Sequence, residues 1–167
     1  MNGGKTDINI TLTVDIDLTG KDWTPIGTED VYKRQTLTAC YATGNVIIEI
    51  DRTENISGGG LVGFNDGISL LSCYATGNVT STGSSTGYVH IGGFLGNNYA
   101  NVMTACYWKN NHEQGIGYNK KSTEATKVDG TGVTWKNAVD AMNTALQNAG
   151  SKWRYELKGA LPTLRKQ

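Results

Sequence analysis

Three cysteines carry the most distinctive chemistry in this sequence. Cys40, Cys73 and Cys106 are separated by a constant step of 33 residues. Thiols can bind zinc or form disulfides, but structural zinc sites use close pairs such as C-x-x-C, and the sequence has no such pair. Three side chains stacked in the same direction also have poor disulfide geometry. The spacing therefore predicts a buried column of free thiols, with no metal and no cofactor.

The sequence contains two histidines, a residue type that can bind metal or act as a catalytic base. His112-Glu113 begins like the zinc-protease string H-E-x-x-H, but the fifth position is Ile116, so the second ligand is absent. We interpret His112 as a loop residue. His90 has no acidic or cysteine partner in the sequence, and we assign it no catalytic role.

Acidic residues offer a second kind of chemistry. Asp15 and Asp17 alternate on one predicted strand, so they share a face and could act as acid and base or bind calcium. Exposed polar positions of a strand account for them equally well. The other charged group near the repeats consists of Asp51, Arg52, Glu54 and Asp66. None of these stacks with a like residue, and we expect no enzymatic activity.

A column of tyrosines is the candidate ligand surface. Tyr41, Tyr74 and Tyr107 follow the same 33-residue step. Facing solvent, they would form a flat aromatic strip suited to stacking on sugars or peptide side chains. Facing inward, they would belong to the core. Strand parity does not decide between these alternatives, because a bulge near each cysteine would reverse the assignment.

One gap-free period places all of these residues. The string Cys40-Tyr-Ala-Thr-Gly-Asn-Val46 recurs unchanged from Cys73 to Val79, and the glycine-rich segment 59–63 recurs at 92–96. Each repeat contains four or more glycines, which cost about 1 kcal/mol each inside a helix, so a helical repeat is excluded. Short strands between Gly and Asn turns fit instead.

The period predicts a mainly β fold, a parallel β-helix or β-solenoid with 33-residue coils, in which residues 33 apart are neighbours. The expected columns are Leu37/Leu70/Met103, Ala39/Ser72/Ala105, Asn45/Asn78/Asn111 and Asn65/Asn98. Asn is expected at coil corners, where it tolerates tight turns.

Gly60-Leu61-Val62-Gly63 resembles the GLUG motif, and Gly93-Phe94-Leu95-Gly96 is similar to it. The resemblance covers about residues 36–108 and extends to the Cys-Tyr-Ala-Thr-Gly-Asn-Val strings. The GLUG family occurs in large bacterial surface proteins, including adhesin-like proteins and non-catalytic regions of immunoglobulin-A-cleaving metallopeptidases. What it implies is a solenoid and an extracellular setting, without an activity.

The motif glycines predict a structural role. We expect one glycine to turn a corner with positive φ and another to permit close approach of a neighbour. Leu61 and Phe94 are expected to fill the interior. Valine at Gly63 or Gly96 should then destabilise the protein more than valine at Gly83, which lies in a Ser/Thr-rich loop.

The two ends depart from the period. Residues 8–18 alternate apolar and polar side chains and predict a strand, whereas Thr28–Gln35 is either an irregular loop or a junction of missing or replaced sequence. Residues 134–149 have helical spacing, with Thr134 as N-cap and Gly150 as C′ residue. We divide the chain into a solenoid at 1–118 and, at 119–167, a helix–strand cap or small following module that covers an open end.

Composition limits the function further. Fifteen basic and fifteen acidic residues give no net charge, so we expect no nucleic-acid partner, and no apolar run is long enough for a membrane span. The prediction is a non-enzymatic adhesin segment or rigid display scaffold, extracellular or at the cell surface, that binds a host or microbial glycan or a surface protein. Its export signal would lie outside this chain. The alternatives are an accessory solenoid of a larger surface protease and a carbohydrate-active β-helix enzyme.

Overall fold

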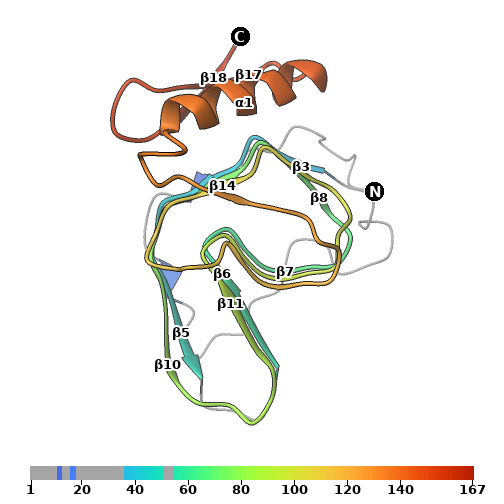
Figure 1. The fold of residues 1–167 in the computed structure, drawn as a ribbon, viewed down its shortest axis with the longest axis vertical. Helices are drawn as coiled ribbons and strands as arrows, with labels where there is room; N and C mark the ends of the chain where they lie inside the picture. Colours follow the sequence, from blue (N-terminus) through green and yellow to red (C-terminus); the bar gives the residue numbers. More distant parts are fainter. Residues whose placement is uncertain (1–10, 13–15, 18–35, 51–54) are drawn as a thin grey trace, which may run out of the picture.

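The computed structural model describes residues 11–12, 16–17, 36–50 and 55–167. The described chain is mainly β with one helix, and its strands form small, open sets (Figure 1). Five of these sets are parallel and one is an antiparallel pair. The predicted mainly β class is therefore confirmed.

Each parallel set brings together strands from successive repeats. The largest contains β1 (Thr11–Leu12), β4 (Tyr41–Ala42), β9 (Tyr74–Ala75), β14 (Tyr107–Trp108) and β16 (Thr126–Lys127). The second contains β10 (Val79–Gly83), β5 (Val46–Ile50) and β2 (Ile16–Asp17), and the third β11 (Val89–Gly92) and β6 (Ile56–Gly59). The fourth contains β15 (Ile116–Asn119), β12 (Leu95–Asn98) and β7 (Val62–Asn65), and the fifth β13 (Met103–Thr104), β8 (Ser69–Leu71) and β3 (Thr36–Thr38).

Pairing across these sets follows the predicted period. Tyr41 pairs with Tyr74, and Tyr74 with Tyr107, each time 33 residues apart. The same step relates β5 to β10, β6 to β11, β7 to β12 and β3 to β8. After this the step shortens, because Leu95 pairs with Ile116 and Tyr107 with Thr126. Parallel pairing thus extends to Lys127, beyond the boundary predicted at residue 118.

Asparagines hold the corners where the strands end. Asn65 Nδ2 donates to Asn98 Oδ1 at 3.1 Å, and Asn98 Nδ2 donates to Asn119 Oδ1 at 3.2 Å. A second column behaves similarly, since Asn45 Oδ1 accepts from the backbone N–H of Asn78. For Asn65 and Asn98, which are fully buried, these bonds satisfy amides that would otherwise cost about 1–3 kcal/mol each. The predicted column of Asn65 and Asn98 is confirmed, and so is the contact between Asn45 and Asn78. The Asn111 side chain instead pairs with the backbone of Val79, accepting from its N–H and donating to its carbonyl.

Helix α1 (Trp135–Asn148) begins and ends where the sequence predicts. Thr134 and Asn137 form a reciprocal capping box, in which each side chain accepts the other residue's backbone N–H. At the other end Gly150 has a φ of 68°, and the N–H of Ser151 donates to the Leu146 carbonyl. This is a Schellman ending, which uses the left-handed conformation that glycine tolerates.

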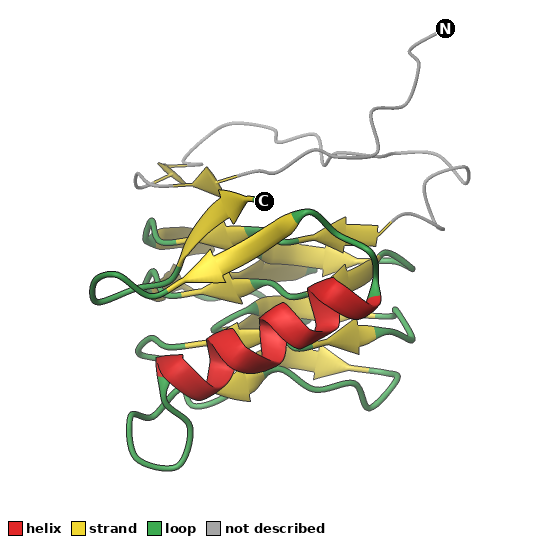
Figure 2. Cartoon of the chain, turned by 90° about the horizontal axis from the view of Figure 1, so that it is seen from above, coloured by secondary structure: helices red, strands yellow, loops and turns green. Residues whose placement is uncertain are grey.

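The C-terminal segment covers a side of the strand stack. In Figure 2 α1 runs obliquely across successive strand layers, and β17 (Trp153–Glu156) and β18 (Thr163–Lys166) form an antiparallel pair beside it. The helix buries five side chains of one face: Trp135, Ala138, Val139, Met142 and Leu146. The sequence predicted a cap over an open end, but the segment packs on the side formed by β4, β9 and β14.

Candidate functional site

The predicted tyrosine column lies under α1. The rings of Tyr41 and Tyr74 are stacked with centroids 4.9 Å apart and planes 2° from parallel. Tyr74 is fully buried, Tyr107 is 9% exposed, and Trp135 of the helix meets the Tyr74 ring edge-on at 5.0 Å. The exposed alternative therefore does not hold for Tyr74 and Tyr107, whereas Tyr41 at the end of the column is half-buried.

Hydrogen bonds fasten this seam between the strands and the C-terminal segment. Tyr74 Oη donates to the Pro162 carbonyl at 2.5 Å, and Tyr155 Oη donates to the Ser72 carbonyl at 2.9 Å. Ser72 Oγ in turn donates to the Met142 carbonyl at 2.9 Å. Burial raises the pKa of both tyrosine hydroxyls, so they stay neutral donors. The column is a structural joint.

A repeated backbone feature explains why parity could not place the tyrosines. Ala39, Ser72 and Ala105, which precede the cysteines, have φ values of 54°, 54° and 50°. This left-handed conformation is uncommon outside glycine, and it turns the chain just before each Cys-Tyr pair. The turn points the cysteine into one core and the tyrosine toward α1.

The three cysteines are buried free thiols, as the sequence predicted. They pack with Leu70, Phe94 and other apolar residues in the interior between the parallel sets. Cys73 Sγ donates to the carbonyls of Leu37 and Leu71 at 3.4 Å. Burial and the neighbouring thiols of Cys106 and Cys40 raise the pKa of Cys73, which keeps it in the unreactive thiol form.

Of the remaining candidates, those within the described residues do not assemble into a reactive site. His112 Nε2 lies 3.0 Å from the Val79 carbonyl, and Glu113 meets Lys127 Nζ at 3.9 Å as an exposed pair. Asp66 is exposed. Residues outside the described part of the chain include Asp15, Asp51, Arg52, Glu54 and the segment Thr28–Gln35.

The glycine motifs bring two strand sets together back to back. A Cβ on Gly96 of β12 would lie 2.5 Å from Gly58 N of β6 and 2.6 Å from Gly63 O. Gly117 of β15 meets Ile91 of β11 in the same way, with the added carbon 2.5 Å from its backbone nitrogen. Such distances exclude any side chain. The close-approach role is therefore confirmed.

Two other expectations about these motifs are wrong. Positive φ occurs at Gly67, Gly83, Gly130 and Gly150 among the described glycines, so no motif glycine has it. Gly83 is the strained position instead, with a φ of 88° and the Ile50 carbonyl against the place of its Cβ. Valine at Gly83 should therefore destabilise the fold as much as valine at Gly63 or Gly96.

The apolar residues of the motif also differ from the simple alternation of a strand. Phe94 and Leu95 are both fully buried in one core, and Leu61 and Val62 pack against it. The chain bends at Leu61 and Phe94 before β7 and β12 begin, so consecutive side chains point the same way. Leu61 and Phe94 do face the interior, as predicted, but their neighbours share it.

An exposed row of aromatic rings is the surface feature that the period did not reveal. We call it the aromatic strip, and it consists of Phe64, Tyr99, Tyr118, His90 and Tyr88. Successive ring centroids along that order are 5.7, 6.0, 4.9 and 6.0 Å apart. Phe64, Tyr118 and His90 lie on β7, β15 and β11, whereas Tyr99 directly follows β12 and Tyr88 directly precedes β11. Figure 1 labels β7 and β11.

The strip combines open ring faces with polar groups. Tyr88 is 72% exposed, Phe64 53% and Tyr118 40%. Lys120 Nζ lies 4.9 Å from the centroid of the Tyr99 ring, a cation–π contact. Large exposed aromatics gathered in one row are unusual on a protein surface, which makes the strip the candidate ligand surface of the described residues.

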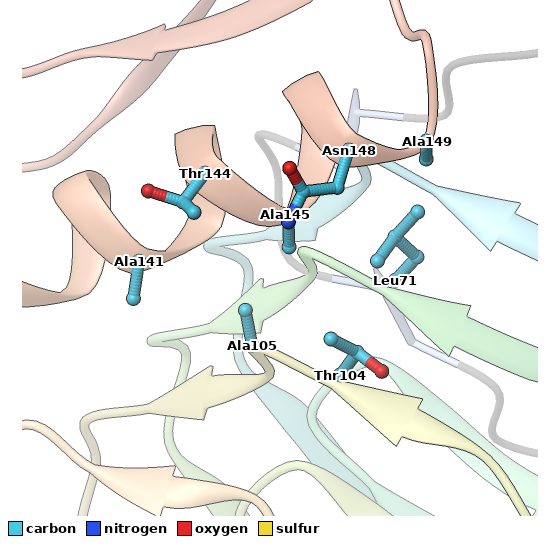
Figure 3. A pocket seen from close by; sticks show the side chains of 8 residues that line it. All are labelled: Leu71, Thr104, Ala105, Ala141, Thr144, Ala145, Asn148 and Ala149. Carbon is cyan, nitrogen blue, oxygen red and sulfur yellow. The ribbon is translucent and has the colours of Figure 1, made fainter.

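A groove between α1 and the strands is a concave feature of the described residues. It has a volume of about 580 Å³ and lies between the helix and the ends of β8 and β13 (Figure 3). Alanines and threonines dominate its lining, which contains no ionisable side chain: Leu71, Thr104, Ala105, Ala141, Thr144, Ala145, Asn148 and Ala149. The groove therefore supplies no acid, base or charged ligand.

Comparison with protein families found one match. The family model described as the GLUG motif matches residues 54–80, which span β6, β7, β8, β9 and the first residues of β10. No curated protein and no solved structure matches the chain. Within the described residues, no helix has the length and apolar character needed to cross a membrane.

Proposed function

Because this chain carries the GLUG motif, we propose that it is a non-enzymatic repeat module of a surface or secreted protein, serving as an adhesin segment or rigid display scaffold. In this proposal the parallel strand sets are successive coils of a β-solenoid with a 33-residue period. Helix α1 and the pair β17–β18 brace one side of it.

The observation that carries the proposal is the constant register. All five parallel strand sets described above keep the same 33-residue step between the repeats that begin near Thr36 and Ser69. A stack in which each unit contacts its neighbours makes a stiff, elongated body whose outer side chains are presented in fixed positions. That is what a display scaffold requires.

Features of the reactive side chains support the non-enzymatic part of the proposal. Catalytic groups normally sit in a cleft with partners that tune their pKa toward neutrality. Here the Cys73 thiol is buried with a raised pKa, and the His112 ring contacts a backbone carbonyl. The groove beneath α1 is lined by groups that do not ionise.

Surface labelling tests this function directly. Antibodies raised against the purified chain are applied to intact and permeabilised cells of the organism that produces it, with an antibody to a cytosolic protein as control. We expect labelling of intact cells, or of the culture medium, that disappears after brief protease treatment. Labelling only after permeabilisation would contradict the proposal.

A further inference from the structure

We propose that the aromatic strip binds a saccharide chain that carries acidic groups. Sugar rings would stack on the rings of Phe64, Tyr99 and Tyr118, and a carboxylate or sulfate would pair with the ammonium group of Lys120. The inference rests on the proposed function, because it takes the chain to be a binding module and names its ligand class.

The geometry of the strip suits an extended, ring-bearing ligand. Its five rings form a continuous row with contacts of 4.9 to 6.0 Å, and the parallel strands fix their positions. Aromatic faces carry partial negative charge, so they attract the polarised C–H groups on the flat face of a sugar. A row of such faces can hold consecutive sugar units.

A buried amide lies within the strip and lacks a partner. Asn97 of β12 is in register with Phe64 on one side and Tyr118 on the other, so the three side chains leave the same face of the set. Asn97 is 7% exposed, and its Oδ1 atom has no hydrogen-bond partner. Buried acceptors are rarely left unpaired. A sugar hydroxyl entering between the flanking rings would donate the missing hydrogen bond.

The positive charge of Lys120 beside the strip favours an acidic saccharide over a neutral one. The Lys120 ammonium lies against the Tyr99 ring, and no carboxylate of the described residues pairs with it. Lys121 follows it in the sequence and is also exposed. A local positive charge beside stacking rings complements the spaced carboxylates or sulfates of an acidic saccharide. The chain's net charge of zero suits the densely charged nucleic-acid backbone less well.

The exposed area of the aromatic strip favours a saccharide over a folded protein as its ligand. Fully buried aromatic side chains contribute about 150–250 Å² each, so five partly exposed rings offer on the order of 500 Å². A stable protein interface needs about 800 Å² from each partner. The strip is too small for that alone, whereas it can cover one face of a short saccharide.

The test uses the whole chain and an immobilised panel of saccharides. The acidic members are polygalacturonate, heparan sulfate and sialylated oligosaccharides, and the neutral members are dextran and cello-oligosaccharides. We expect an acidic member to bind, with affinity that falls as salt rises. Tyr118→Ala and Phe64→Ala should each weaken that binding about tenfold, and Lys120→Gln should weaken it for acidic members alone.

Leu157→Ala is the matched control, because Leu157 is 40% exposed like Tyr118 but lies just after β17 in the C-terminal segment. It should bind as the parent does, and thermal melts should show all four variants folded. No binding to any member, or binding unchanged in the strip variants, would overturn the inference. Binding unaffected by Lys120→Gln would overturn its acidic part. Surface labelling of cells reports on the proposed function separately, so the two can fail independently.

Discussion

Replacing Gly96 with alanine is the sharpest perturbation that the packing allows. The added Cβ would lie 2.5 Å from Gly58 N, 2.8 Å from Gly58 O and 2.6 Å from Gly63 O, all of them backbone atoms. Backbone cannot rotate away as a side chain can, so β6 and β12 must separate. Overpacking of a well-packed interior typically costs about 1–3 kcal/mol, and three backbone contacts place this variant near 3 kcal/mol.

Two matched variants calibrate that figure. Gly63→Ala meets a single backbone oxygen, that of Ser57, at 3.0 Å and should cost about 1 kcal/mol. Gly159→Ala has no atom within 4 Å of its new carbon and should change stability by no more than about 0.5 kcal/mol. Urea unfolding followed by tryptophan fluorescence gives the free energies. Thermal melts should show Gly96→Ala about 6–12 °C below the parent.

The order of these three variants is the critical result. If Gly96→Ala unfolds within 0.5 kcal/mol of Gly159→Ala, the strands do not pack back to back through these glycines. If Gly63→Ala is the least stable of the three, the backbones approach most closely at Gly63 and not at Gly96. Either result would refute the account of the glycine motif.

Three further predictions concern the turn, the tyrosines and the thiols. Ala105→Val should be about 1–2 kcal/mol less stable than Ala105→Gly in urea unfolding, because a β-branched residue resists the φ of 50°; equal stabilities would argue against the left-handed turn. Burial raises the pKa of Tyr74 and Tyr155 above the usual value near 10, so their contribution to stability is complete below about pH 10. It is lost as the pH rises from there toward the folded-state pKa, by up to about 1.4 kcal/mol per pH unit per group. The double variant Tyr74→Phe, Tyr155→Phe should therefore lose less free energy of unfolding between pH 8 and pH 11, and an equal loss would mean that other groups cause it. The Cys73 thiol should resist a thiol reagent at pH 8 in the native protein and react in urea, whereas fast native reaction would place it at the surface.

The sequence predicted the pairing partners because the period is encoded in identical strings. Once Cys40 is aligned with Cys73, each residue of one repeat is aligned with the residue 33 positions later. The pairing of Leu37 with Leu70 follows directly. The helix could also be predicted, since Thr134 and Gly150 are strong boundary signals. The repeat was sufficient for the pairing, and local boundary residues were sufficient for the helix.

Side-chain direction could not be predicted from the same period. The left-handed turns at Ala39, Ser72 and Ala105 occur at residues that carry no sequence signal for that conformation. They send the tyrosines outward to a face that α1 then covers, and the location of α1 depends on tertiary packing alone. The turns and the location of α1 together decide whether the tyrosines form a binding surface or a structural contact with the helix.

The aromatic strip could not be found from columns, because its members do not repeat. Phe64 is aligned with Asn97, and Asn97 with Tyr118, where the step has changed from 33 to 21 residues. His90 comes from a different strand set that approaches through the motif glycines. A strip built across a change of period has no regular spacing in the sequence.

The central claim is that residues 33 apart lie side by side in a stack, and spin labels test it most directly. Ile47 and Thr80 are exposed register partners on β5 and β10, so labels there should sit about one strand spacing apart, roughly 5 Å at the backbone. A second pair of labels, at Ile47 and Lys136, has one member on β5 and the other on α1. In Figure 1 α1 lies at the top of the molecule, and β5 points toward the bottom. With the three native cysteines replaced by alanine, the account predicts strong dipolar broadening for the first pair and none for the second. An unbroadened spectrum from Ile47 and Thr80 in the folded protein would contradict it.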